Sequence, residues 1–297
     1  MNTPARQLVF GDDGSAAADV VWLWINNHRW PGWRISVVTA VKPPLGAPVG
    51  TERSTAHPWE PPTPRRLLCT SDDVEVEHLM AEADPRLVLD SFTDAGLMAI
   101  GPRGAGLLKQ LGLGSTAEWL ISAHRPLAPL AVIRSARATR SVLLCVDGSL
   151  HARRATRAMA RLPWIADTHV TVLGVADGSP GIERGVDDAA GMLESHGIAE
   201  VSTHLARAIP QVATFDVRST ILKTIDTTSP DLVVMGPRGL GGLRRAALGS
   251  TASAVLRHAA CSVLISPSNQ VEAIDAGRPR ATSPAASMAS VQPGLAG

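Results

Sequence analysis

The chain lacks the residues and segments that mark several common classes of protein. Among its 297 residues there is no tyrosine, and only three are cysteines, without paired spacing. This pattern excludes a disulfide framework and a cysteine-based zinc site. No apolar stretch reaches the roughly 18 residues of a membrane span, and no basic segment followed by an apolar one marks a secretion signal. We therefore expect a soluble, cytoplasmic protein.

Strong charge and the common catalytic motifs are also missing. The formal net charge is +1, so no strong field favours nucleic acid or an anionic membrane. The chain has no G-x4-G-K-S/T phosphate loop, no His-Glu-x-x-His motif and no serine nucleophile elbow. His124 and His258 stand near the ends of two predicted helices, where a C-terminal cap explains them better than catalysis. The sequence thus offers no catalytic residue.

What the chain does contain is a glycine pattern with the spacing G-x2-G-x9-G-S, which occurs twice, 135 residues apart. Its members are Gly101, Gly104, Gly114 and Ser115 in the first copy and Gly236, Gly239, Gly249 and Ser250 in the second. Each copy follows a short apolar run and precedes a predicted helix. Glycines let the backbone approach a ligand closely, and amide groups at a helix N-terminus point at its phosphates. Each copy is therefore predicted to form an anion cradle.

The two halves of the chain repeat each other. Leu8–Ser15 matches Val142–Ser149, and Ile35–Val41 matches Val170–Ala176, at offsets of 134 and 135 residues. A period this long indicates two domains, and an apolar content of 45% suffices for two cores of about 135 residues each. We expect one domain over residues 1–136, a second over 137–267 and a disordered tail over 268–297.

Strand-like and helix-like segments alternate in both halves. This order predicts an α/β fold in which each domain is Rossmann-like, a five-stranded parallel sheet with helices on both faces. Strands are expected at Leu8–Phe10, Ile35–Val41, Val74–His78, Leu97–Ile100, Leu130–Ile133, Val142–Val146, Val170–Val175, Glu200–Leu205, Leu232–Met235 and Ser262–Ile265. Helices are expected from Ser15 to His28, from Ser149, and over Asp84–Asp94, Ser115–His124, Ile182–His196, Asp216–Thr227 and Ser250–His258. The proline-rich segment from Lys42 to Pro64 is predicted to be a long loop.

Ligands of open parallel sheets bind beyond the carboxyl ends of the strands, where the strand order reverses. The turns Asp13–Ser15 and Asp147–Ser149 end the first strand of each half, and the glycine loops end the fourth. If these strands are neighbours, each aspartate lies beside a glycine loop and can accept a hydrogen bond from a ribose or help to hold a cation. Ordinary turn chemistry is the alternative explanation. Ser115 is predicted to cap its helix, with Glu118 completing a capping box.

Three blocks carry a resemblance to a known family: Val146–Ser149, Asp231–Gly239 and Leu248–Thr251. They are similar to the universal stress protein (UspA-type) family. The order and spacing of all elements resemble a tandem member, over about residues 6–134 and 140–266. The resemblance implies two adenine nucleotide alpha hydrolase-like domains that bind ATP through the glycine motif. It also implies a dimeric, nucleotide-responsive regulator of growth arrest and stress survival rather than an efficient enzyme.

The same resemblance implies where the nucleotide lies. The strand-one aspartates and the ends of the second strands, Ala40 and Val175, would form the adenine and ribose site. The phosphates would lie on the loop glycines and the serine after them, with magnesium or manganese carried on the triphosphate. The candidate binding residues are Asp13, Ala40, Gly101, Arg103, Gly104, Gly114, Ser115 and Thr116 in the first half, and Asp147, Val175, Gly236, Arg238, Gly239, Gly249, Ser250 and Thr251 in the second. The two loop arginines either reach phosphate or are solvated.

The halves differ in ways that bear on function. Asp12 stands where the second half has Val146, which puts two carboxylates beside a polyanion, so the second site is expected to bind ATP at least as well as the first. The last predicted strands are apolar edges, which are expected to pair with each other within the chain, and a further homodimer is compatible with this. Two alternatives to a nucleotide-binding regulator remain: an interaction scaffold without nucleotide and a slow ATP-hydrolysing enzyme.

Overall fold

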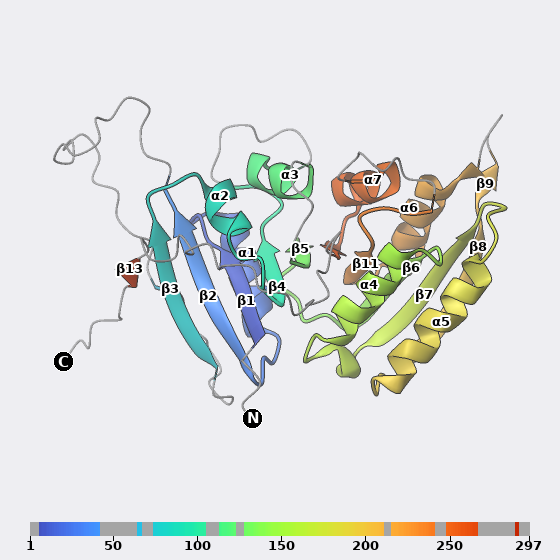
Figure 1. Cartoon of the computed structure of the whole chain (residues 1–297), viewed down its shortest axis with the longest axis horizontal. Coiled ribbons are helices and arrows are strands. Elements are labelled where there is room, and N and C mark those ends of the chain that lie inside the picture. Colours follow the sequence, from blue (N-terminus) through green and yellow to red (C-terminus); the bar gives the residue numbers. More distant parts are fainter. Residues whose placement is uncertain are drawn as a thin grey trace, which may run out of the picture.

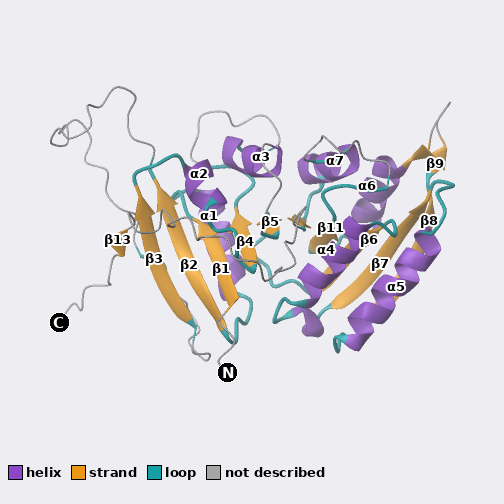
Figure 2. Cartoon of the chain, viewed as in Figure 1, coloured by secondary structure: helices purple, strands orange, loops and turns teal. Residues whose placement is uncertain are grey.

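A computed structural model describes residues 6–41, 64–66, 74–104, 113–122, 128–210, 215–240, 248–266 and 289–290. Most of the predicted loop over 42–64 and most of the predicted tail lie outside these residues, as do Cys69 and His124. The described chain is an α/β structure around one long sheet of eleven strands (Figures 1 and 2). None of its helices is long and apolar enough to cross a membrane.

The first half supplies five strands and three helices. They are β1 (Arg6–Gly11), α1 (Ala16–Asn26), β2 (Trp33–Ala40), β3 (Glu75–Ala81), α2 (Pro85–Asp90), β4 (Leu97–Ile100), α3 (Ser115–Ser122) and β5 (Leu130–Val132). All five predicted strands are present, within one to three residues of their expected ends. Helix α2 is shorter than the predicted Asp84–Asp94. It ends at Asp90, and the hydroxyl of Ser91, the residue after it, donates to the carbonyl oxygen of Val88 at 2.7 Å.

The second half repeats this order with longer helices. Its main elements are β6 (Ser141–Val146), α4 (Leu150–Ala160), β7 (His169–Ala176), α5 (Ile182–Ser195), β8 (Val201–Arg207), α6 (Val217–Thr228), β11 (Leu232–Met235), α7 (Ser250–His258) and β12 (Ser262–Ile265). A short 3₁₀ turn, Ile165–Asp167, precedes β7, and β9 (Ile209–Pro210) pairs with β10 (Phe215–Asp216) in a separate ribbon. The predicted strands and helices of this half are confirmed.

The strand order is β13-β3-β2-β1-β4-β5-β12-β11-β6-β7-β8. Within each half the five strands are parallel, as the alternating pattern predicted. Strands β5 and β12 pair antiparallel, with Ala131 opposite Leu264, so the two sheets continue into one. The antiparallel pairing places the carboxyl end of β5 beside the start of β12, so these two central strands run in opposite directions.

Three short strands were not predicted: β9, β10 and one in the expected disordered tail. Ala289–Ser290 forms β13, which pairs antiparallel with Met80 and Leu79 of β3. The pairing extends the sheet at the outer edge of the first half, where β3 would otherwise present unpaired backbone groups. Figure 1 shows β13 beside β3, far along the sheet from the elements that precede it in sequence.

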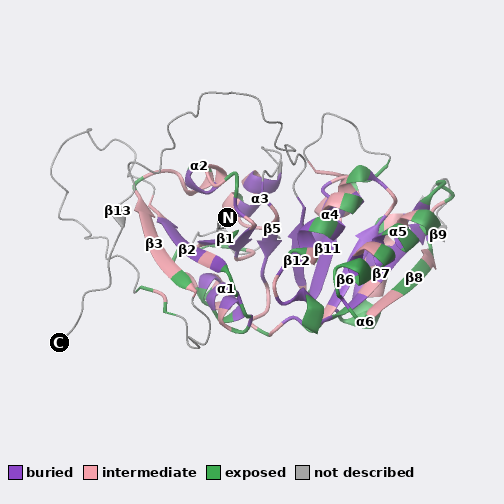
Figure 3. Cartoon of the chain, turned by 60° about the horizontal axis from the view of Figure 1, so that its bottom comes forward, coloured by how far each residue is buried: buried purple, intermediate pink, exposed green. Residues whose placement is uncertain are grey.

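Two hydrophobic cores lie on the two faces of the sheet. Side chains alternate along a strand, so Leu8 and Phe10 of β1 join the core under α1, α4 and α5, while Val9 joins the core under α2, α3, α6 and α7. Both cores run through both halves, and Figure 3 shows the buried residues concentrated in the strands. The prediction that the tryptophans serve packing is confirmed: Trp22, Trp24, Trp30, Trp33 and Trp164 are all buried.

Aromatic residues also join the halves. The ring of Trp164, from the second half, lies edge-on to Trp24 at 5.7 Å and 4.3 Å from the imidazole of His28. His28 Nδ1 donates to the carbonyl oxygen of Trp24 at 2.7 Å, and its Nε2 accepts from the amide of Thr139 at 2.9 Å. This arrangement requires a neutral ring, and burial lowers the pKa of His28 to about 4.

Candidate functional site

The first and fourth strands are neighbours in both halves. Phe10 of β1 lies opposite Ala99 of β4, and Leu144 of β6 lies opposite Val234 of β11. The aspartate turn at the end of the first strand and the glycine loop at the end of the fourth therefore meet at the same carboxyl edge. This is the reversal point of the strand order, where parallel sheets bind ligands.

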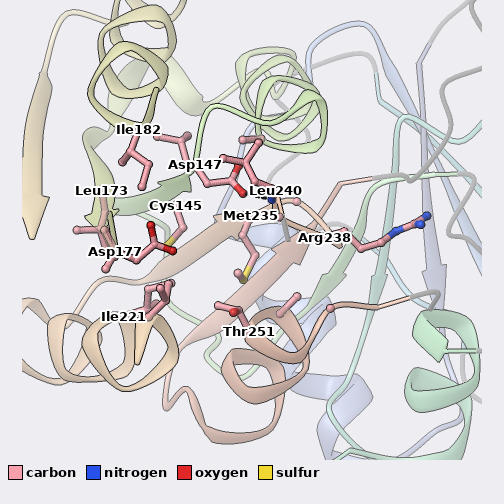
Figure 4. A pocket seen from close by; sticks show the side chains of 18 of the residues that line it. Cys145, Asp147, Leu173, Asp177, Ile182, Ile221, Met235, Arg238, Leu240 and Thr251 are labelled. Carbon is pink, nitrogen blue, oxygen red and sulfur yellow. Dashed lines mark hydrogen bonds between the residues drawn. The ribbon is translucent and has the colours of Figure 1, made fainter. Parts of the chain in front are cut away.

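In the second half a pocket of about 340 Å³ opens at this edge (Figure 4). Its lining includes every second-half residue that the sequence singled out: Asp147, Val175, Gly236, Arg238, Gly239, Gly249, Ser250 and Thr251. Sequence reasoning missed the rest of the lining, which comprises Cys145, Val146, Ala152, Leu173, Asp177, Ser179, Ile182, Val217, Ile221, Met235, Leu240 and Ala252. Most of these belong to strand ends or to α5 and α6, and apolar residues at such places have no sequence signal beyond that of ordinary core positions.

The pocket has two chemically different sides. An apolar wall comes from the ends of β6, β7 and β11 and from α5 and α6, with Leu173, Ile182 and Ile221 among its members. A polar edge comes from the aspartate turn, the glycine loop and the first turn of α7, where Ser250 and Thr251 lie. Burial raises the pKa of the Cys145 thiol to about 12, so this wall carries no thiolate charge at neutral pH. The pocket thus joins an apolar wall to a polar edge.

The aspartate is held directly against the glycine loop. Asp147 Oδ1 accepts from the amide of Ser149 at 3.0 Å, and Oδ2 accepts from the amide of Leu240 at 2.8 Å. A Cβ on Gly239 would lie 2.6 Å from Asp147 Oδ2, and a Cβ on Gly104 would lie 2.3 Å from the matching oxygen of Asp13. The sequence predicted that the second glycine of the motif makes room for a phosphate. In the structure it makes room for the carboxylate of the protein's own aspartate.

The first glycine of the motif serves packing. A Cβ on Gly236 would lie 2.8 Å from the Cβ of His151 in the first turn of α4, and a Cβ on Gly101 would lie 3.0 Å from that of Ala17 in α1. The helix that follows the first strand therefore crosses the start of the glycine loop at a distance that only glycine permits. The first glycine of the motif, like the second, therefore packs against another part of the protein.

The two ends of each glycine loop are tied by the same hydrogen bond. The amide of Gly114 donates to the carbonyl oxygen of Pro102, and that of Gly249 to Pro237, both at 2.7 Å. Residues 105–112 and 241–247, between these ends, lie outside the described residues. The described ends of the two loops are therefore tied alike, each just before the first turn of α3 or α7.

The predicted capping box is wrong. Helix α3 begins at Ser115, and the amide of Glu118 donates to the carbonyl oxygen of Gly114 at 2.9 Å. Gly114 therefore holds the cap position, as Gly249 does in α7, where no side chain caps the helix. The carboxylate of Glu118 pairs with Arg257 at the end of α7 instead. A charged partner from the other half thus replaces the local backbone partner.

The two loop arginines do not converge on the cradles. Arg238 contributes to the lining of the pocket, but Figure 4 shows its side chain extending away from Cys145, Leu173 and Ile221. Arg103 lines a different pocket, where the two halves meet. His151 lies near Arg238 and Arg154, and burial together with these two charges lowers its pKa. This arrangement therefore does not favour a direct role for Arg103 or Arg238 in holding phosphate.

The carboxyl edge of the sheet has different side-chain contacts in the first half. Asp12, which replaces Val146, is only 3% exposed and forms a bidentate ion pair with Arg65: Nε donates to Oδ2 at 2.7 Å and Nη2 to Oδ1 at 3.1 Å. Arg65 also pairs with Asp19 at 2.7 Å. Arg65, which sequence reasoning did not single out, therefore reduces the repulsion expected between Asp12 and a polyanion.

Apolar side chains also crowd this edge of the first half. Gly11 stands where Cys145 lines the second-half pocket, and a Cβ on Gly11 would lie 3.1 Å from Ile100 and 3.2 Å from Leu89. Leu89 belongs to the short helix α2, which packs where the second half has the longer α6. Ala40 lies opposite Ala81 in the β2–β3 register, and Ser115 and Thr116 begin α3. Leu89 and Ile100 thus pack closely around Gly11 at this edge of the described first half.

No group of three or more His, Cys, Asp or Glu residues is arranged to hold a metal ion in the described part of the chain. An aspartate beside the glycine loop can give one oxygen to a cation that phosphate oxygens hold, or bind it through water.

The fold and site define an α/β protein with a glycine-loop pocket at the carboxyl edge of a parallel sheet. A family model described as the Universal stress protein family matches residues 138–267. The second half of the chain is therefore a universal stress protein domain, and the first half has the same fold. No curated protein matches the chain.

Solved structures match over most of the chain. A universal stress protein from Archaeoglobus fulgidus is 17% identical, with 90% of this chain and 100% of that chain covered, at a TM-score of 0.61. A putative universal stress protein from Pseudomonas aeruginosa is 17% identical, with 88% and 92% covered, at 0.52. A universal stress protein in complex with cAMP is 20% identical, with 44% and 98% covered, at 0.36. At these identities the first two comparisons show that the tandem fold is shared.

Proposed function

We propose that this chain is an ATP-binding universal stress protein that acts as a nucleotide-responsive regulator in stress adaptation or growth arrest. The observation that carries the proposal is the second-half pocket, in which every sequence-predicted residue of that half meets an apolar wall. An adenine ring matches the apolar wall of Leu173, Ile182 and Ile221. A triphosphate matches the glycine loop and the start of α7, where unpaired backbone amides and the helix dipole favour negative charge.

The residues between these two parts suit a ribose. Asp147 lies at the boundary between the apolar wall and the loop, and its carboxylate can accept hydrogen bonds from ribose hydroxyls, which compete with the bond from Leu240. Gly249 caps α7 through its backbone alone, so the hydroxyls of Ser250 and Thr251 are available to phosphate oxygens. Magnesium or manganese would arrive on the triphosphate and would neutralise part of its charge there.

We propose that the second half holds the nucleotide and that the first half binds it weakly or not at all. The support is the close packing of Leu89 and Ile100 around Gly11, together with the ion pair between Asp12 and Arg65. In the second half the matching positions, Cys145 and Val146, line an open pocket. The second site is thus still proposed to bind ATP at least as well as the first. The reason is now the packing of side chains in the first half rather than charge repulsion by Asp12.

We also propose that the two halves remain paired through β5 and β12 in solution and that the chain works in the cytoplasm, as a monomer or a homodimer. Both edge strands are buried and apolar, which supports a permanent pairing. Separation would expose these edges, and edges of that kind promote aggregation. The oligomeric state has no comparable support in the chain and is left to measurement by light scattering.

The direct test is nucleotide analysis of the purified full chain after denaturation, followed by calorimetric titration of the nucleotide-free protein with ATP. The matched pair is Gly239→Val and Gly104→Val, since each places a side chain on the adjacent aspartate of its own half. We expect Gly239→Val to abolish binding and Gly104→Val to leave it within about threefold of wild type. Circular dichroism and thermal melting confirm that the variants are folded.

Other outcomes identify the alternatives. Loss of binding with Gly104→Val alone would move the site to the first half. Full binding in the folded double variant would rule out the glycine cradles. Absence of nucleotide and of any ATP binding would leave an interaction scaffold, and turnover above about 0.1 per second would indicate an enzyme.

A further inference from the structure

A carboxylate, that of Asp177, faces the apolar wall of the second-half pocket. Asp177 directly follows β7, which ends at Ala176, and it belongs to the pocket lining. Figure 4 shows its side chain pointing into the pocket on the side of Leu173 and Ile221, apart from Arg238. Sequence reasoning did not single out this residue. A charged group on an apolar wall needs an explanation, because a ligand that covers it removes it from water.

The carboxylate of Asp177 is held in place by the turn that it begins. Its Oδ1 accepts a hydrogen bond from the amide of Ser179 at 2.9 Å. Gly178, between them, has a φ of +90°, in the left-handed region that glycine adopts most readily. A carboxylate has about four acceptor positions, so the bond from Ser179 leaves room for further donors. The turn thus orients an acceptor toward the pocket without using up its capacity.

The nucleotide proposed above would place its base at this end of the pocket. Its phosphates would lie at the start of α7, where Ser250 and Thr251 are, and its ribose beside Asp147. The base would then extend along the apolar wall toward Ile221 and Asp177. The edge of the base that lies farthest from the ribose would therefore meet the carboxylate of Asp177.

A carboxylate discriminates between base edges because it accepts hydrogen bonds and donates none. Adenine carries an amino group at carbon 6, which donates. Hypoxanthine carries a carbonyl oxygen at the same carbon, which a carboxylate repels. A bound base without a donor at this place would also leave the covered carboxylate unpaired, and this costs more than the loss of one ordinary hydrogen bond.

We propose that Asp177 selects the base in the second-half site by accepting a hydrogen bond from the exocyclic amino group of adenine. This inference rests on the proposed ATP site and goes beyond it, since it names the residue that distinguishes adenine from a 6-oxo purine. In the repeat the position of Asp177 corresponds to Lys42, at the offset of 135 residues that relates the second strands. A lysine carries donors and no acceptor, so this selecting group belongs to the second half alone.

The test is calorimetric titration of the nucleotide-free full chain with ATP, ITP and GTP. Wild type is expected to bind ATP about tenfold or more tightly than ITP, since one charge-assisted hydrogen bond is at stake. In Asp177→Asn the affinity for ATP is expected to fall about tenfold and that for ITP to rise, because the amide can donate to a 6-oxo group. Asp188→Asn is the control: it removes the same charge from the exposed face of α5 and leaves all three affinities unchanged.

The outcomes separate this inference from the proposed function. A wild-type chain that binds no nucleotide contradicts both. Equal affinity of wild type for ATP and ITP overturns the base selection alone, without any variant, and so does an ATP-to-ITP ratio that is the same in wild type and Asp177→Asn. A wild-type preference for GTP over ATP that disappears in Asp177→Asn also overturns it, because guanine would then donate its ring N–H and 2-amino group to Asp177. Thermal melting without nucleotide checks that the variants are folded.

Discussion

Asp147 accepts a hydrogen bond from the backbone amide of Leu240 at 2.8 Å, which fastens the turn after β6 to the glycine loop after β11. The bond joins the two chain segments that a nucleotide would have to touch together. Its counterpart in the first half is the contact between Asp13 and the position of Gly104. A substitution at Asp147 therefore tests both the loop and the ligand.

We expect Asp147→Ala to weaken ATP binding by roughly tenfold to a hundredfold, because one charge-assisted hydrogen bond is lost and the loop is no longer fixed. Hydrogen exchange of the Leu240 amide is expected to accelerate in the same variant. Calorimetry and exchange mass spectrometry measure the two effects. Asp13→Ala is the matched control and leaves ATP affinity unchanged. Equal losses from both variants would contradict the assignment of the site to the second half.

The fold was predictable from the sequence because its signals are local or repeated. The apolar runs gave the strands, and the recurrence of the same blocks gave their equivalence in the two halves. The glycine motif marked the loops at the carboxyl edge before any contact was known. Ser149 was expected to begin a helix, and its hydroxyl does accept from the amide of Ala152 at 3.1 Å.

The parts that were missed depend on partners far apart in sequence. Arg65 meets Asp12 across 53 residues, and Arg257 meets Glu118 across 139. Neither pair lies at a spacing that a helix or strand would reveal. The apolar wall of the pocket is similar, since Ile182 and Ile221 resemble any core residue of a helix until packing places them at its rim. Sequence thus marked the glycine loops, and tertiary packing supplied the apolar wall of the second-half pocket.

The first glycine of the motif gives a stability prediction. Gly236→Ala is expected to destabilise the chain by about 1–3 kcal/mol, because its Cβ would lie 2.8 Å from His151 and force α4 away from the loop. The control is Gly191→Ala in the middle of α5, where nothing beyond the adjacent backbone of the same helix lies within 4 Å of the new Cβ. There we expect stabilisation by about 0.5–1 kcal/mol from higher helix propensity. Urea unfolding measures both, and similar effects of the two variants would contradict the packing role.

The ion pair of the first half gives a second stability prediction. Arg65→Met is expected to destabilise the chain by about 2–4 kcal/mol, since Asp12 stays buried without its bidentate partner. Asp12→Val restores the apolar residue of the repeat and removes the charge. The double variant is therefore expected to be more stable than Arg65→Met alone. Urea unfolding of the four proteins completes the cycle. Additive losses from the two substitutions would show that the pair is not coupled.

The last prediction concerns acid. His28 has a pKa of about 4 in the folded chain, below its ordinary value of 6.5, so the unfolded state binds the proton more readily. The contribution of the neutral ring is complete above pH 6.5 and is lost as the pH falls from 6.5 to 4. The loss reaches about 3 kcal/mol at the lower end.

Because His28 bonds to Trp24 and Thr139 and contacts Trp164, this loss falls on the junction of the two halves. Asp231 is the charged group that acts on His28, and it favours the protonated ring only weakly against burial. Urea unfolding at pH 7 and pH 4.5, followed by tryptophan fluorescence, measures the change. In His28→Gln, which does not titrate, the difference between the two pH values is expected to shrink by about 2–3 kcal/mol. A pH dependence that is the same in wild type and His28→Gln would show that acid acts elsewhere in the chain.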